Sequence, residues 1–212
     1  MKPEAVTVVS HPLLVHSLTI LRKKETTTEE FRRHAAVVSK ILVLEATKAL
    51  KLEDEHIDTP LAPFAGKKLA DDVIVVPVLR AGLAMLFAIQ DFLPSVAVGF
   101  VGLERDEKTA IAREYYQKLP KIFASYKVLV IDPMLATGGS FDDTLAILKS
   151  KGAKHITVVC VVAAPEGIAR VRRKHPDVPI ITAAVDTKLN DKAYIVPGLG
   201  DFGDRYFGTE SA

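Results

Sequence analysis

The sequence predicts an α/β protein with a mostly parallel, twisted sheet flanked by helices. From about residue 73 onward, apolar segments of strand length recur, and helical segments lie between them. The apolar segments are rich in valine and isoleucine, as is typical of strands that are buried on both faces of a parallel sheet. Such sheets bind ligands at the carboxyl ends of their strands. The loops after the strands are therefore the places to look for a functional site.

Composition favours one globular domain spanning residues 1–212. The chain has 212 residues, 49% of them hydrophobic, and a formal net charge of +2, which suits one domain with an added arm or hood. A nearly neutral chain is a poor candidate for coating nucleic acid. No segment reaches the roughly 18 apolar residues of a membrane span, and no signal peptide is recognisable. We therefore expect a cytoplasmic protein with no nucleic-acid or membrane partner.

Cysteine and histidine usage indicates neither a disulfide framework nor a metal site. The single cysteine, Cys160, lies in an apolar run and is expected to be a buried strand residue rather than a reactive thiol. None of the six histidines has metal-ligand spacing. We expect them to be structural or surface residues, and we expect the basic cluster at 170–174 to be a solvated helix face.

The first element predicted with a clear signal is a helix from about residue 27 to 50. Thr27 and Glu30 have the spacing of a capping box. Apolar residues then follow at helical spacing, namely Phe31, Ala35, Val38, Leu42 and Ala49. Upstream, His11 and Pro12 interrupt a short apolar run, and no element is predicted there.

A projecting β-arm is predicted next, at about residues 56–70. This stretch contains Pro60, Pro63 and Gly66, which favour turns and exposed strands over a buried element. An apolar helix before the arm and the arm itself both suggest an oligomer, because exposed apolar elements often form interfaces.

The sheet is predicted to contain five strands, at residues 73–78, 96–103, 128–131, 156–163 and 180–185. Helical segments follow the first, third and fourth of them, at about residues 83–93, 140–151 and 165–174. The polar stretch 105–118 is expected to be a hairpin that acts as a lid and excludes water.

The loop at residues 132–140 carries the clearest functional signal. Asp132 stands at a strand tip, where its carboxylate can accept hydrogen bonds from sugar hydroxyls. Gly138 and Gly139 let backbone amides approach an anion closely, and Thr137 and Ser140 add hydroxyls. A helix that begins here adds unpaired N–H groups. The loop lacks the lysine of a Walker A motif, so we predict a phosphate site of another kind.

This loop resembles the phosphoribosyl-diphosphate loop of type I phosphoribosyltransferases. Its Pro133 after a single acid is similar to the uracil phosphoribosyltransferase branch. Further segments resemble the same family, in the family's order, at residues 10–13, 76–82, 114–120, 162–167 and 194–201. The resemblance covers nearly the whole chain. It implies that uracil and phosphoribosyl diphosphate react, with Mg²⁺, to give UMP and diphosphate.

The resemblance also implies roles for individual residues. Asp132, Arg105 and Arg80 are the expected catalytic residues, and a strained peptide is expected near Arg80. Phosphoribosyl diphosphate is expected to contact Arg80, Arg105, Asp201 and the loop residues Asp132, Pro133, Met134, Leu135, Ala136, Thr137, Gly138, Gly139 and Ser140. No direct metal ligand is expected, because Mg²⁺ is usually held through substrate phosphates and water.

A base-binding hood is expected at residues 186–212. The resemblance implies that uracil is bound there, largely by main-chain atoms, at Ile195, Gly200, Asp201 and Phe202. The sequence departs from the family's usual pattern at Phe202, where a smaller residue is common, and at Glu104, where an aromatic is common. The family also implies a homodimer or homotetramer and a possible GTP or other nucleotide effector.

Two alternatives from other classes stay open at this point. A non-catalytic nucleotide-sensing regulator on the same fold would bind RNA or DNA, and the nearly neutral charge speaks against it. A dinucleotide-dependent oxidoreductase is suggested only by the glycine pattern at 198–203. That pattern would have to open a helix inside a βαβ unit, and too few residues follow it.

Overall fold

A computed structural model describes residues 5–91, 93–105 and 112–209; for residues 103–105 and 112–114 it describes the backbone but not the side chains. The main sheet confirms the predicted fold, because its strands run parallel except for the edge strand β7. The strand order is β1-β11-β10-β8-β4-β6-β7. The bounds are β1 Val6–Val8, β4 Val73–Leu79, β6 Phe100–Arg105, β7 Ala112–Lys118, β8 Lys127–Ile131, β10 His155–Ala163 and β11 Ile180–Val185.

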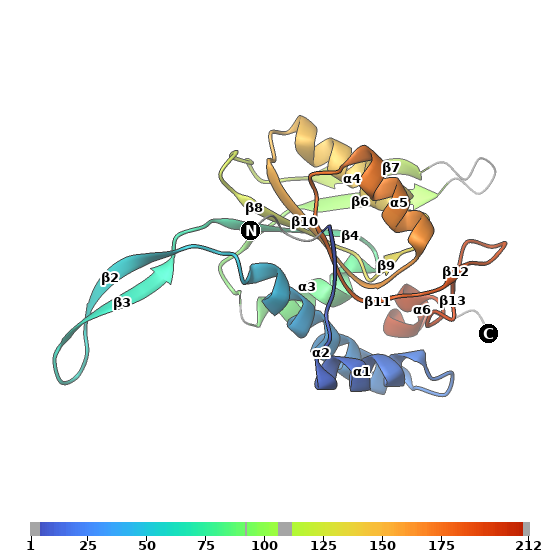
Figure 1. Cartoon of the computed structure of the whole chain (residues 1–212), viewed down its shortest axis with the longest axis horizontal. Coiled ribbons are helices and arrows are strands. Elements are labelled where there is room, and N and C mark those ends of the chain that lie inside the picture. The colour runs from blue at the N-terminus through green and yellow to red at the C-terminus, as the bar shows by residue number, and fades with distance from the viewer. Residues whose placement is uncertain (1–4, 92, 106–111, 210–212) are drawn as a thin grey trace.

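Helices cover both faces of this sheet (Figure 1). Helices α1 (Pro12–Arg22), α2 (Thr28–Thr47) and α3 (Gly82–Gln90) pack on one face, and α4 (Gly139–Ser150) and α5 (Pro165–Lys174) pack on the other. Within the described ranges, no helix has the length and apolar character needed to cross a bilayer.

Alternate strand residues build two separate cores. Val75, Leu129 and Val159 face the α1–α3 side, whereas their neighbours Ile74 and Val128 face the α4–α5 side. All five are buried. This is why the strands read as continuous apolar runs: both faces of a covered parallel sheet must be apolar.

Helix α1 and strand β1 were not predicted. His11 and Pro12 do not interrupt an element here; they begin one. The Nδ1 atom of His11 accepts a hydrogen bond from the backbone N–H of Leu13 at 3.2 Å, and Pro12 occupies the first turn. Proline suits that position, because the N–H that it lacks would have no intrahelical partner.

Helix α2 confirms the predicted capping box. The Thr27 hydroxyl accepts from the backbone N–H of Glu30 at 3.3 Å, and the Glu30 carboxylate accepts from the backbone N–H of Thr27 at 3.4 Å. The helix ends at Thr47, a few residues before the predicted bound.

The arm is an antiparallel hairpin of β2 (Leu52–Asp58) and β3 (Pro63–Leu69) that projects from the body (Figure 1). It begins at Leu52, before the predicted bound of residue 56. The sequence did not indicate this earlier start, because residues 53–55 are acidic and give no apolar alternation. Lysines on the opposite strand hold them, with Lys67 lying 2.5 Å from Asp54.

The predicted strand at 96–103 is divided in the structure. A short β5 (Ala97–Val98) and β6 both pair with β4, and Gly99 lies between them. A Cβ atom at Gly99 would lie 2.6 Å from Cδ2 of Leu119, so a larger residue there would require that side chain to shift. Strand β7 pairs with β6 as the predicted hairpin; the remainder of the predicted lid, residues 106–111, lies outside the described residues.

Cys160 is fully buried in β10, as predicted. Burial raises the pKa of its thiol to about 12; the Asp132 carboxylate adds to this effect and the Thr182 hydroxyl opposes it. We expect no reaction of the native protein with a thiol reagent at pH 8, and complete labelling in denaturant. Rapid labelling under native conditions would contradict the buried assignment.

Candidate active site

The loop after β8 is fastened along its outer edge to β10. Residues Met134–Leu135 form the short strand β9, which runs parallel to the end of β10. The carbonyl oxygen of Pro133 accepts from the backbone N–H of Val161 at 2.9 Å, and that of Leu135 accepts from Ala164 at 2.8 Å. These bonds fix the path of the backbone into the next segment.

The segment then turns sharply into α4. Gly138 has a φ of 77°, a left-handed conformation that favours glycine. A Cβ atom there would lie 2.9 Å from the carbonyl oxygen of Gly167, so the backbones of this loop and α5 touch. Since α4 begins at Gly139, its first N–H groups have no intrahelical partner. These N–H groups give the start of α4 a positive polarity that suits an anion.

Asp132 stands half-buried at the tip of β8. Its Oδ1 atom accepts from the backbone N–H of Met134 at 3.1 Å. Burial raises the pKa of the Asp132 carboxyl to about 7; repulsion by the Asp201 carboxylate adds to the rise, and the Met134 hydrogen bond opposes it. A carboxyl group with a pKa so far above its usual value is typical of a functional site.

A pocket of about 250 Å³ lies between this loop and the hood. The loop contributes three residues and the hood seven, while Ala81 follows β4 and precedes α3. The lining is Ala81, Asp132, Met134, Ala136, Ala193, Tyr194, Ile195, Gly200, Asp201, Phe202 and Gly203. The pocket thus lies at the carboxyl ends of the strands, where this class of fold binds ligands.

Comparison with known proteins matches the architecture to one family. Residues 8–209 match the family model for uracil phosphoribosyltransferase. The chain belongs to the uracil phosphoribosyltransferase family.

Proteins with that name share about half of their residues with this chain. The protein of Dictyoglomus thermophilum is 50% identical over 206 residues, covering 97% of this chain and 100% of its own length. The Clostridium botulinum protein (strain Hall) is 48% identical over 206 residues, covering 97% and 99% respectively. The Salinibacter ruber protein is 46% identical over 209 residues, covering 99% and 100%.

Solved structures agree with this assignment. The structure of the AQ2163 protein from Aquifex aeolicus superposes with a TM-score of 0.92 at 36% identity, covering 98% of this chain and 100% of its own. An adenine phosphoribosyltransferase from Trypanosoma brucei, at 12% identity and a TM-score of 0.60, shares the fold over 90% of this chain. The regulator alternative finds no support among these relatives.

The pocket gathers seven of the residues predicted from the uracil phosphoribosyltransferase resemblance, namely Asp132, Met134, Ala136, Ile195, Gly200, Asp201 and Phe202. The other loop residues, Pro133, Leu135, Thr137, Gly138, Gly139 and Ser140, belong to the adjoining turn and α4 and do not line it. Four lining residues were missed: Ala81, Ala193, Tyr194 and Gly203. Ala81 and Tyr194 stand within the motifs at 76–82 and 194–201, which could have indicated them.

Of the two predicted arginines, only Arg80 has a described side chain, and it does not line the pocket. Arg80 follows β4 with an exposed side chain, and the peptide bond between Leu79 and Arg80 is cis. Arg105 ends β6, which pairs with β4, but its side chain and that of Glu104 lie outside the described residues.

Phe202 fits the site despite its size. Its side chain is 1% exposed and packs against Phe31 of α2, with ring centroids 5.0 Å apart and an edge-to-face angle of 70°. Most of its bulk therefore lies in the core, and its backbone stays beside the pocket. The glycine pattern at 198–203 does precede a helix, α6 (Phe202–Phe207). However, the strand before it is antiparallel, and no parallel strand follows in the described part of the chain, which argues against a dinucleotide fingerprint.

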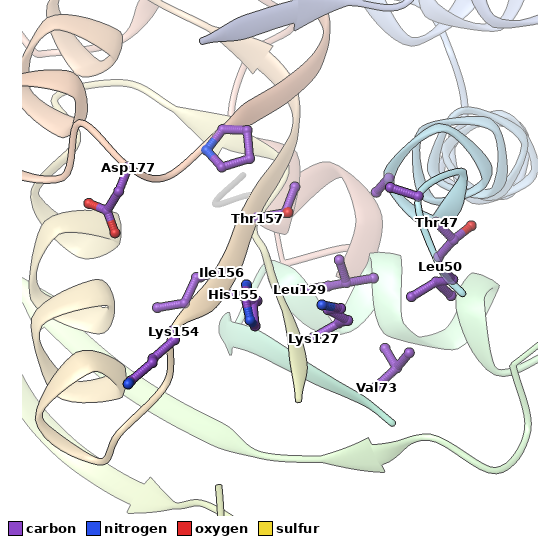
Figure 2. Close-up of a pocket in the computed structure, with 13 residues that line it drawn as sticks. Thr47, Leu50, Val73, Lys127, Leu129, Lys154, His155, Ile156, Thr157 and Asp177 are labelled. Carbon is purple, nitrogen blue, oxygen red and sulfur yellow. The ribbon is translucent and has the colours of Figure 1, made fainter. Parts of the chain in front are cut away.

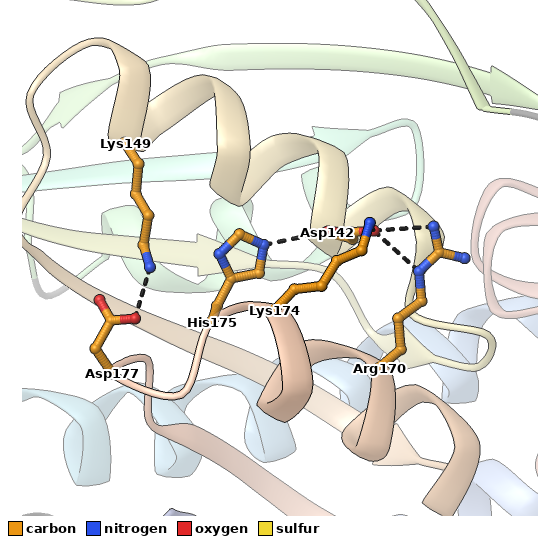
Figure 3. A network of polar contacts seen from close by, with 6 residues as sticks. All are labelled: Asp142, Lys149, Arg170, Lys174, His175 and Asp177. Atoms are coloured by element: carbon orange, nitrogen blue, oxygen red, sulfur yellow. Dashed lines mark hydrogen bonds and ion pairs between the residues drawn. The ribbon is translucent and has the colours of Figure 1, made fainter.

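A network of charges holds α4 against α5 behind the phosphate loop (Figure 3). Asp142, in the first turn of α4, accepts from Arg170 at 2.9 Å, Lys174 at 2.7 Å and His175 at 3.2 Å. Burial raises the pKa of Asp142, but these hydrogen bonds outweigh it and hold that pKa below its usual value. Part of the basic cluster predicted as a solvated face therefore fastens the two helices, and His175 is one of the structural histidines.

A second cavity, of about 260 Å³, opens at the opposite end of the sheet (Figure 2). It lies at the amino ends of β8 and β10, between Lys127, His155 and the last turn of α2. Sheets of this class bind substrates at the carboxyl ends of their strands. This cavity lies at the amino ends, so it is not the candidate active site.

Proposed function

We propose that this protein transfers the 5-phosphoribosyl group from phosphoribosyl diphosphate to uracil, giving UMP and diphosphate. The observation that carries the proposal is the pocket shared by the phosphate loop and the hood, in a chain that belongs to the uracil phosphoribosyltransferase family. One ligand placed there would touch a phosphate site at one end and a site for a flat base at the other.

The 5′-phosphate is assigned to the loop from Ala136 to Ser140. The support is the turn at Gly138 and the start of α4, which together direct backbone N–H groups and the positive end of the helix dipole at an anion. The hydroxyls of Thr137 and Ser140 add donors. The network at Asp142 holds this helix in place from behind.

Asp132 is assigned to the ribose hydroxyls, with Asp201 on the diphosphate side of the sugar. In the reaction the bond from the anomeric carbon to diphosphate breaks, and a bond to a uracil nitrogen forms. Positive charge builds on the sugar in between, so two carboxylates beside it stabilise the transition state. The support is that both carboxylates line the pocket, and that repulsion by Asp201 adds to the rise that burial gives to the pKa of Asp132.

The departing diphosphate is assigned to Arg80 and Arg105, since guanidinium groups bind phosphate oxygens in bidentate fashion. Among the described residues, no group of three or more His, Cys, Asp or Glu side chains is arranged to hold a metal ion. Asp132 and Asp201 are hard oxygen ligands beside the pocket, which suits Mg²⁺ shared with substrate phosphates and water. When bound, Mg²⁺ would neutralise charge on the diphosphate.

Uracil is assigned to the hood, where Ile195, Gly200 and Phe202 line the pocket. The test is incubation of labelled uracil with phosphoribosyl diphosphate, with and without Mg²⁺, followed by separation of UMP. We expect UMP only when Mg²⁺ is present. Absence of UMP from folded protein, with other bases also unreactive, would overturn the proposal and make RNA binding at low salt the next measurement.

Arg105→Ala should raise the KM for phosphoribosyl diphosphate by roughly 10- to 100-fold, the effect of losing charge-assisted hydrogen bonds to one anion. Arg33→Ala is the matched control, because Arg33 is exposed on α2 and pairs only with Glu29 in the described structure. Steady-state kinetics measure both. A normal KM in the Arg105 variant would remove Arg105 from the diphosphate site.

The proposal also covers the oligomeric state of the protein and its cellular compartment. Exposed apolar side chains on α2 and the arm support a homodimer or homotetramer, among them Leu44, Leu52, Ile57, Leu61, Phe64 and Leu69. A single buried cysteine supports the cytoplasm. Binding of GTP or another nucleotide effector is part of the same proposal and rests on the family alone.

A further inference from the structure

The hood has little regular structure of its own. It contains the two-residue strands β12 (Lys188–Leu189) and β13 (Ile195–Val196) and the six-residue helix α6. So short a hairpin and helix are marginal by themselves. The loop between β13 and α6 carries the pocket residues Gly200 and Asp201, so its shape must come from contacts with the rest of the chain.

An ion pair from the first helix supplies one such contact. Arg22, in the last turn of α1, donates from Nη1 and Nη2 to the two carboxylate oxygens of Asp186, both at 2.7 Å. Asp186 follows β11, and its side chain is 6% exposed. Its backbone N–H donates to Ala163 at the end of β10 at 2.8 Å. Asp186 is therefore fixed at the carboxyl ends of β10 and β11.

The same pair holds both backbone polar groups of Gly198. Nη1 of Arg22 donates to the Gly198 carbonyl oxygen at 2.7 Å, and the Gly198 N–H donates to Oδ2 of Asp186 at 2.8 Å. Gly198 has a φ of 61°, and a Cβ atom there would lie 2.1 Å from the carbonyl oxygen of Ile195. The loop is thus tightly folded at the residue that the ion pair holds.

A second arginine acts from the hood side. Nη1 of Arg205, in α6, donates to the carbonyl oxygens of Leu21 and Leu199, the latter at 2.7 Å, and Nη2 donates to Lys23 at 2.6 Å. The end of α1 is therefore bonded to the loop on both sides of Arg22. Two guanidinium groups join the first helix to the segment that lines the base end of the pocket.

We propose that Arg22 and Asp186 are positioning residues for uracil recognition. Neither lines the pocket; they act by holding Gly198, which lies between the uracil-assigned residues Ile195 and Gly200. The phosphate loop is fixed separately, by β10 and α5. Disturbing the ion pair should therefore affect uracil more than phosphoribosyl diphosphate, whose only assigned contact in this loop is Asp201. This inference rests on the proposed function.

Arg22→Lys is the test variant, because lysine keeps the charge but lacks the planar fork that reaches Asp186 and Gly198 together. We expect the KM for uracil to rise by about tenfold, as when one charge-assisted hydrogen bond to a loop is lost, with the KM for phosphoribosyl diphosphate changed less than about twofold. Arg33→Lys, on the exposed surface of α2, is the control. An unchanged uracil KM, or equal rises in both constants, would overturn the inference.

Hydrogen exchange of the ligand-free variant provides a readout that does not depend on activity. We expect faster exchange at residues 195–200 and unchanged exchange in β10. Asp186→Asn should produce the same pattern, and the double variant should add little, because the two residues act as one unit. If wild-type protein formed no UMP, the proposed function alone would fail, and exchange would still decide whether the pair holds the loop. Unchanged exchange at 195–200 would show that the ion pair does not hold the loop.

Discussion

Asp132→Asn should lower kcat by at least about 100-fold, the scale seen when a charge that stabilises a transition state is removed, without loss of stability at pH 8. The folded structure disfavours the ionised form of Asp132, because burial and the Asp201 carboxylate raise the pKa of Asp132 from 3.8 to about 7. Asparagine removes the charge and keeps an oxygen that can accept the Met134 hydrogen bond. The variant should therefore unfold at an equal or higher denaturant concentration.

The direction in which stability changes with pH is a further check on Asp132. A carboxyl group whose pKa is raised by folding contributes stability below its unfolded pKa, and this stability is lost as the pH rises through the folded pKa. The wild type should therefore lose stability relative to Asp132→Asn between about pH 4 and pH 8. The kcat/KM for phosphoribosyl diphosphate should rise with pH, with a midpoint near 7.

Denaturant titrations at pH 5 and pH 8, together with kcat, measure these effects. Asp72→Asn is the control, since Asp72 is exposed at the far end of β4 and its carboxylate has no part in the site. A loss of activity in Asp132→Asn that matched a loss of folded protein would contradict the assigned role of Asp132.

Gly167→Ala should raise the KM for phosphoribosyl diphosphate by at least about tenfold and lower the free energy of unfolding by about 1–3 kcal/mol, the usual cost of overpacking. A Cβ atom at Gly167 would lie 2.4 Å from the carbonyl oxygen of Ala136 and 2.9 Å from that of Leu135. Both are backbone atoms of the phosphate loop, so the loop itself would have to move.

Gly66→Ala in the arm is the matched control, because the nearest atom to its Cβ would be a Phe64 ring carbon at an ordinary 3.5 Å. Initial rates at varied phosphoribosyl diphosphate and chemical denaturation compare the two variants. If Gly167→Ala bound the substrate normally, α5 could not be what shapes the phosphate loop.

Local signals predicted much of this structure. Helix α5 and strand β11 begin and end at their predicted residues. Pro165 and Pro176 bracket α5, and β11 is an almost entirely apolar run that follows Pro179. The loop at 132–140 stood out as a candidate site because its polar residues and glycines are contiguous in the sequence. The Thr27 capping box was readable for the same reason.

The features that sequence reasoning missed depend on contacts between distant residues. Helix α1 is an exception: its N-cap contact is local, but His11 is not one of the common capping residues. The close packing of Leu119 on Gly99, where the predicted strand divides, joins separate segments of the chain. Neither the pair of Arg22 and Asp186 nor the burial of Phe202 against Phe31 leaves a local pattern.

The bonds between α1 and the hood also set an order for biosynthesis. Arg22 meets its partner 164 residues later in the chain, and the bond from Arg205 to Leu21 spans 184 residues. Contacts of such long sequence separation form late, because closing the intervening chain costs entropy. On the ribosome, residues 132–140 and the helix after them are made before the base half of the site, which must await residues 195–205. In a nascent chain, the segment assigned to the sugar phosphate would therefore fold before the segment assigned to the base.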